Sequence, residues 1–178
     1  MKKIGIIVGS NRTKSVTKRL AEWVSSQLSR GDVQAEIVDL VEVDLPWLDE
    51  PELPSARNYQ YESTKQWSQQ IQGYDGIVFI SPQYNWGYPA VLKNAVDTLY
   101  EEWQNKPVAT IFFGGHGGFQ AELAFSLVLQ GLKVKRLPTN LSWQLPLGQI
   151  DAEMTDKQVA IIMAKFQSEV DLLWSTLS

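Results

Sequence analysis

Residues 77–103 decide the fold, and they read IVFISPQYNWGYPAVLKNAVDTLYEEW. The first four, IVFI, form an apolar run without polar alternation, which is typical of a central parallel strand buried on both faces. A polar and aromatic loop at residues 82–87 follows, and Pro89 marks the start of a helix, because a missing N–H costs nothing in the first helical turn. The order strand, loop, helix places this loop at the edge where open α/β sheets bind ligands.

The helix predicted after Pro89 extends to Trp103 and has apolar residues at helical spacing. They are Val91, Leu92, Ala95, Val96, Leu99, Tyr100 and Trp103. This set is wider than the stripe of about 100° that covers one side of a sheet, so something else should cover the remainder. We therefore expect a homodimer through residues 91–103. The alternative is a helix that is deeply buried within its own chain.

A similar strand, loop and helix are predicted at the amino terminus. Residues 3–8 form a buried first strand, and the loop at residues 9–15, GSNRTKS, leads into an amphipathic helix. Backbone N–H groups and the positive end of the helix dipole would form an anion site, to which Arg12 adds donors. The loop has neither GxGxxG nor GxxxxGKS, so a monophosphate fits it better than a dinucleotide. Hydroxyl groups before a helix can also be simple caps.

A third loop, GGHGG at residues 114–118, follows a buried strand predicted at residues 108–113. Its glycines let the backbone approach a flat ligand closely and point N–H groups at an oxygen that becomes negative. His116 has two possible roles, a ligand contact or an acid–base group, and no Asp or Glu stands near it in the sequence.

Strands and helices alternate along the whole chain. Further strands are predicted at residues 33–40 and 133–143, the latter interrupted by Pro138, and further helices at residues 61–71, 119–130 and from Thr155 onward. This alternation indicates one α/β domain over residues 1–178, a doubly wound, five-stranded parallel sheet. The monophosphate loop favours the flavodoxin-like strand order 2-1-3-4-5, in which the three loops meet at one end of the sheet.

Composition removes several classes of chemistry. The chain has 178 residues, no cysteine and one histidine, which leaves no thiol catalysis, iron–sulfur ligation or Cys/His zinc site, and no metal is expected. The formal net charge is −4, and the 16 basic and 20 acidic residues are interspersed along the chain. No broad basic face therefore indicates nucleic-acid binding. The apolar run that ends at Val8 is too short for a signal peptide or membrane helix, so we expect a cytoplasmic protein with no membrane partner.

Two of these stretches resemble the NAD(P)H-dependent flavin mononucleotide (FMN) reductase family. Residues 82–103 match its signature PxYNxxxPxxLKNAxDxL, and residues 9–21, GSNRTKSVTKRLA, match its phosphate loop GSxRxxSxNxxLA. Thr17 departs from the pattern because the family usually has Asn there, and the shorter Thr should make the weakest contact of the loop. Residues 114–118 are similar to the family's less diagnostic GxxGG.

The resemblance implies FMN held by the three loops, with chemistry carried by the cofactor and no catalytic side chain. The cofactor-binding residues that it implies are Ser10, Arg12, Ser15, Val16 and Thr17 at the phosphate; Pro82, Gln83, Tyr84, Asn85, Trp86 and Gly87 along the ring and ribityl chain; and Gly114, Gly115, His116, Gly117 and Gly118 at the N1 side. Hydride would pass from NADPH or NADH to FMN and on to a free flavin, quinone, azo compound or oxidised metal ion. Dimerisation through residues 91–103 is also implied.

Two other functions are compatible with the same fold. A flavodoxin-type electron carrier would bind FMN and dock on proteins without meeting NAD(P)H. Such carriers usually have a Thr/Ser-Gly-rich phosphate loop and strong acidity, so Arg12 and the mild net charge argue against this class. A flavin-binding regulatory module without turnover has the same motifs. A yellow protein that NADPH or NADH bleaches would favour the reductase.

Overall fold

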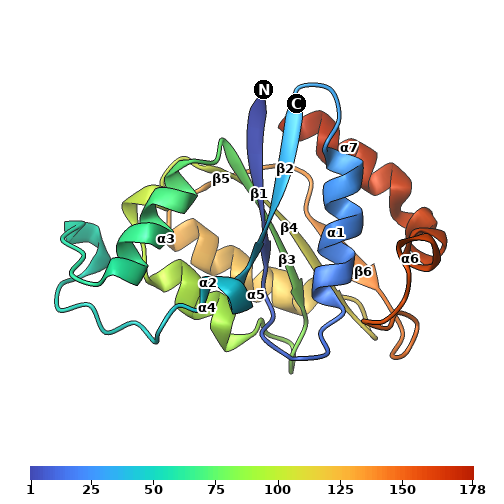
Figure 1. Ribbon diagram of the computed structural model, residues 1–178, viewed down its shortest axis with the longest axis horizontal. Coiled ribbons are helices and arrows are strands. Elements are labelled where there is room, and N and C mark those ends of the chain that lie inside the picture. The colour runs from blue at the N-terminus through green and yellow to red at the C-terminus, as the bar shows by residue number, and fades with distance from the viewer.

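The sheet of the computed structural model has the strand order β2-β1-β3-β4-β5 (Figure 1). Its strands are β1 (Lys2–Val8), β2 (Val33–Asp39), β3 (Gly76–Pro82), β4 (Pro107–Gly114), β5 (Lys135–Arg136) and β6 (Leu141–Gln144). All of the pairings are parallel, and the structure describes residues 1–178. The predicted flavodoxin-like order is confirmed.

The predicted last strand is present as two pieces, β5 and β6, that both pair with β4. Between them the side chain of Asn140 accepts a hydrogen bond from Thr110 Oγ1 (3.1 Å) and donates one to Leu137 O (2.9 Å). A proline cannot donate to a ladder and is found at edges or bulges. The interruption at Pro138 therefore divides the edge of the sheet and gives a sixth short strand.

Helices cover both faces of the sheet (Figure 1). One face carries α1 (Thr17–Leu28), α6 (Asp156–Met163) and α7 (Gln167–Leu177), and the other carries α3 (Glu62–Gln72), α4 (Ala90–Asp97) and α5 (Phe119–Gly131). The remaining elements are α2 (Leu40–Val43) and the 3-10 turns η1 (Pro54–Ala56), η2 (Glu101–Trp103) and η3 (Ala164–Phe166). The last predicted helix is thus divided by η3. No helix has the length and apolar character needed to cross a membrane.

The central strands are buried on both faces because successive side chains along a strand point to opposite sides. In β3, Val78 and Ile80 belong to the core that includes α1, whereas Ile77 and Phe79 belong to the core that includes α3, α4 and α5. All four side chains are fully buried. This arrangement agrees with the continuous apolar run from which the strand was predicted.

The helix predicted to reach Trp103 ends at Asp97. The final turn of a helix leaves carbonyl groups without intrahelical partners. Here two buried indoles supply the donors: Trp67 Nε1 donates to Ala95 O (2.8 Å) and Trp103 Nε1 donates to Val96 O (3.0 Å). The chain turns after α4 and continues through η2, which brings Trp103 back into the core.

Five of the seven apolar residues predicted along residues 91–103 are buried within one chain. Leu92, Ala95, Val96, Leu99 and Trp103 are each at most 1% exposed, and all pack in the core that includes α3 and α5. Val91 and Tyr100 are only partly buried against the same core. Most of the surplus is thus covered within the chain, as in the alternative of a deeply buried segment, and a homodimer through residues 91–103 stays a prediction.

We expect Trp103→Phe to lower the free energy of unfolding by about 2 kcal/mol, because it removes the hydrogen bond to Val96 O and leaves part of a buried site empty. Trp86→Phe is the matched control, since that side chain is 70% exposed, and should change it by less than about 0.5 kcal/mol. Urea denaturation measures both. Equal losses in the two variants would contradict the role assigned to Trp103.

Candidate functional site

The three predicted loops meet at the carboxyl end of the sheet around a cavity of about 240 Å³. The predicted site residues that line it are Arg12, Ser15, Val16, Pro82, Gln83, Tyr84, Gly114 and Gly115. The other predicted site residues do not line it: Ser10, Thr17, Asn85, Trp86, Gly87, His116, Gly117 and Gly118. The loops thus form one site, but only part of each loop faces the cavity.

The first loop combines a helix whose N-cap residue, Val16, provides no side-chain cap with an unpaired hydroxyl group. No side chain caps the start of α1 at Val16, and the first turn of the helix has no acidic residue. Ser10 is 2% exposed, and its Oγ has no hydrogen-bond partner. Buried hydroxyl groups almost always have partners, and free N–H groups at a helix start attract anions. This end of α1 therefore has the properties of an anion site.

Ser15 and Thr17 are hydrogen-bonded to each other. Ser15 Oγ accepts a hydrogen bond from the Thr17 backbone N–H (3.1 Å) and donates one to Thr17 Oγ1 (2.8 Å). The simple-cap role thus applies to Ser15 in part, and the buried Thr17 hydroxyl orients Ser15 rather than facing the cavity.

The charges at the cavity are of one sign. Arg12 and Lys14 line it, both are exposed, neither forms an ion pair, and no carboxylate is among the lining residues. The start of α1 adds roughly half a positive charge from the helix dipole. A phosphate dianion would match this arrangement.

The second loop is a tight turn at residues 84–87. Tyr84 and Gly87 exchange two backbone hydrogen bonds of 2.9 and 2.8 Å, and Asn85 and Trp86 have φ angles of 48° and 64°. Two successive positive φ angles in a two-residue connection define a type I′ turn. The turn exposes Asn85 and Trp86, and a left-handed conformation at a bulky Trp stores strain.

Gln83 joins the second loop to the third. Its backbone N–H donates to Phe113 O (2.8 Å), and its side-chain Oε1 accepts a hydrogen bond from the Ala121 N–H (3.0 Å) at the start of α5. Its position at the cavity is therefore fixed at both ends, by β4 and by α5.

The glycines of the third loop differ in the structural requirement that each one meets. Gly115 lines the cavity, and a Cβ built there would meet nothing within 4 Å. Gly117 has a φ of 82° and closes a turn by donating to Gly114 O (3.0 Å). A Cβ on Gly118 would lie 2.3 Å from the Phe112 carbonyl carbon. His116 is exposed at the tip of the turn, without a carboxylate partner.

A fourth wall of the cavity was not predicted. It is the segment after β6, residues 145–155, and its lining residues are Leu145, Pro146, Leu147, Gly148 and Ile150. Lys14 and Phe113 are further lining residues absent from the prediction. Leu147 is 98% exposed, and Gly148 has a φ of 76°. The signal was a Pro-Leu-Gly turn directly after the last predicted strand, where no site loop was predicted.

Comparisons with known proteins agree with this geometry. A family model of NADPH-dependent FMN reductases matches residues 2–144. The chain is 39% identical over 160 residues to an NAD(P)H-dependent FMN reductase of Saccharomyces cerevisiae, with 83% of each chain covered. It is 41% identical over 160 residues to an NAD(P)H-dependent FMN reductase of Schizosaccharomyces pombe, with 88% of this chain and 80% of the relative covered.

The fold is similar to that of FerB from Paracoccus denitrificans, a flavoenzyme NAD(P)H:(acceptor) oxidoreductase. The TM-score is 0.74 and the sequence identity 25%, with 99% of this chain and 97% of FerB covered. The first three loops of the cavity lie within the residues that the family model matches, whereas the fourth wall begins where the match ends.

Two alanine variants should separate the glycines of the third loop. Gly118→Ala should lower the free energy of unfolding by about 2 kcal/mol, because the new methyl group meets the Phe112 backbone.

Gly115→Ala should leave stability unchanged and weaken FMN binding roughly tenfold, because its methyl group enters the cavity. Urea denaturation and flavin titration measure these effects. The assignment fails if Gly115→Ala binds FMN like the wild type.

Proposed function

As the chain belongs to the NADPH-dependent FMN reductase family, we propose that it transfers hydride from NADPH or NADH to FMN held in the cavity, and then electrons to a small oxidant. The observation that carries the proposal is the start of α1, where Val16 provides no side-chain cap, Arg12 and Lys14 line the cavity without ion-pair partners, and the preceding loop holds the unpaired Ser10 hydroxyl. When bound, FMN supplies the redox chemistry.

The residues at the cavity fit the chemistry of FMN. The cofactor carries one phosphate dianion. One such anion could be bound by the cations Arg12 and Lys14 together with the free N–H groups of α1. Its ring is flat and largely apolar, and the wall opposite the phosphate loop offers Leu145, Leu147 and Ile150. The absence of a Cβ at Gly115 leaves room for close approach to the backbone.

The protein groups of the cavity would bind FMN, orient it and exclude water from it. Arg12 and Lys14 would hold the phosphate, Tyr84 and Gln83 would border the ring, and the backbone of Gly115 would face its polar edge. No side chain of the cavity is paired as an acid–base group, since neither a carboxylate nor His116 lines it. Proton transfer by a side chain is therefore not part of the proposal.

The oxidants proposed are free flavin, a quinone, an azo compound or an oxidised metal ion. The lining favours planar organic oxidants among these. Leu145, Pro146 and Leu147 form an apolar rim, and Leu147 is almost fully exposed beside it. Apolar surface at a pocket favours a molecule that can cover it, which a hydrated metal cation does not.

Arg12→Ala tests the phosphate assignment. Loss of one charge-assisted hydrogen bond of about 1.5 to 3 kcal/mol should raise the dissociation constant of FMN about 10- to 100-fold, with an unchanged fold. Lys157→Ala, at an exposed cation on α6 outside the cavity, is the control for net charge. Flavin titration of the apoprotein gives the constants. The reductase proposal itself fails if NADPH and NADH both leave the colour of FMN-loaded protein unchanged.

We propose that the protein forms a homodimer, and that α5 supplies a contact beside the predicted one at residues 91–103. Phe119, Leu123 and Leu127 are 61%, 55% and 67% exposed and recur every fourth residue along α5. Residues at this spacing lie on one side of a helix. The helix thus presents an apolar stripe to solvent, and exposed apolar patches mark interfaces.

Leu123→Glu combined with Leu127→Glu should convert the dimer into a monomer, because the contact would then desolvate unpaired charges. Leu172→Glu is the control, since Leu172 is an equally exposed leucine on α7, across the sheet. Sedimentation at micromolar concentration measures the assembly. A wild-type chain that sediments as a monomer would end the dimer proposal and leave the reductase proposal untouched.

A further inference from the structure

Arg19 connects the two sides of the cavity. We infer that Arg19 is a positioning residue, which anchors the fourth wall (residues 145–155) to α1 and thereby slows the release of FMN. The inference rests on the proposed FMN site. Arg19 does not line the cavity, so its effect would pass through the wall.

The fourth wall has few other attachments. At one end Leu145 N–H donates to Gly114 O (2.9 Å), and Ile150 is buried in the core. Between residues 146 and 153 the hydrogen bonds are local, such as Gln149 N–H to Pro146 O (3.1 Å), and none reaches another element. The position of the wall therefore depends on Ile150 and on its two ends, where Leu145 is buried in the same core and Met154 packs against it.

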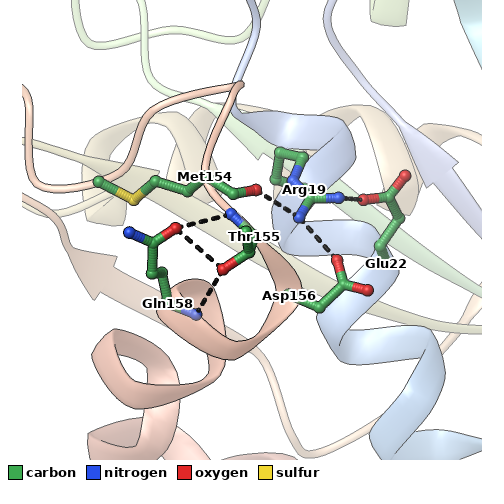
Figure 2. A network of polar contacts seen from close by, with 6 residues as sticks. All are labelled: Arg19, Glu22, Met154, Thr155, Asp156 and Gln158. Atoms are coloured by element: carbon green, nitrogen blue, oxygen red, sulfur yellow. Dashed lines mark hydrogen bonds and ion pairs between the residues drawn. The ribbon is translucent and has the colours of Figure 1, made fainter.

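The far end of the wall is held by Arg19 (Figure 2). Arg19 Nη2 donates to Met154 O (2.7 Å) and to Asp156 Oδ1 (2.7 Å), and Nη1 pairs with Glu22. Beside this contact, Thr155 and Gln158 form a capping box that starts α6. The guanidinium fork therefore binds the last residues of the wall and the first residue of the helix that follows.

The side chains of α1 and α6 leave open space beside the Arg19 guanidinium. A groove of about 330 Å³ lies between α1 and α6 and is lined by Arg19, Trp23, Asp156 and Val159, among others. Val159 and Met163 of α6 pack in the same core as Leu20 of α1, so the two helices also share apolar contacts. Beside the groove, the fork supplies the polar contact from α1 to the residues that start α6. The Arg19 side chain is only 18% exposed, and its two terminal nitrogens contact Glu22, Met154 O and Asp156, so its position is well defined.

The same contact reaches the phosphate side of the cavity. Arg19 lies in the first turn of α1, directly after the loop that contributes Arg12, Lys14, Ser15 and Val16 to the cavity. Because Arg19 joins this turn to the end of the wall, it sets the separation between the two sides of the site. A wall released from α1 would open the cavity and let FMN leave faster.

Arg19→Met tests the inference, because Met keeps an aliphatic stem and removes the fork. The acids left behind, Glu22 and Asp156, are 37% and 93% exposed, so no buried charge is stranded. Arg30→Met is the matched control. Arg30 follows the carboxyl end of α1, pairs with Asp171 of α7 (2.6 Å) and lies over the Trp174 ring. It therefore also connects this part of the chain to a carboxyl-terminal helix, but it does not contact the wall.

We expect FMN release, followed as the rise of flavin fluorescence after dilution, to become roughly tenfold faster in Arg19→Met and to change less than about twofold in Arg30→Met. Hydrogen exchange of residues 145–154 in the apoprotein should rise in Arg19→Met alone. Equal release rates in Arg19→Met and wild type, or unchanged exchange of the wall, would overturn the inference. If the wild type bound no FMN, the proposed function would fail, whereas the exchange result would still decide whether Arg19 holds the wall.

Discussion

Parallel pairing of β1, β3 and β4 is the constraint on which the site depends, because it brings the carboxyl ends of three distant strands to one edge. Val8 lies opposite Ile80, and Ile80 opposite Ile111. The ladder continues past the strands: Gly9 N–H donates to Ile80 O (2.8 Å), and Ser81 Oγ donates to Gly9 O (3.2 Å). The loops thus leave the sheet already in register, and a site between them needs no further ordering.

The strand order and three of the four cavity walls could be predicted because their signals are local. An apolar run such as residues 77–80 and a polar loop after it lie within a few residues of each other. The end of α4 could not be predicted in this way, because the donors at its last carbonyls come from Trp67 and Trp103. Likewise, residues 145–150 became a wall only because β6 pairs with β4 after the break at Pro138.

The glycine loop shows the limit of reading function from composition. Four glycines at residues 114–118 suggested one purpose, close approach to a ligand. The structure divides them: Gly115 borders the cavity, Gly117 needs a positive φ, and Gly118 must make room for the Phe112 backbone. A glycine can thus be required by packing or by turn geometry one residue away from a position where a ligand is the reason.

The charges at the start of α1 explain why an acidic chain can hold an anion. Cations in the first turn of a helix oppose its dipole, but Lys18 pairs with Glu42 (2.6 Å) and Asp39 (3.1 Å), contacts that raise the pKa of Lys18. Arg19 is likewise paired, with Asp156 and Glu22. Arg12 and Lys14 have no such partner, so the positive potential of the cavity comes from them and from the free N–H groups of α1. A bound phosphate would offset their mutual repulsion, and binding to the folded state alone stabilises that state. The same charges that favour the anion therefore couple cofactor binding to the stability of the fold.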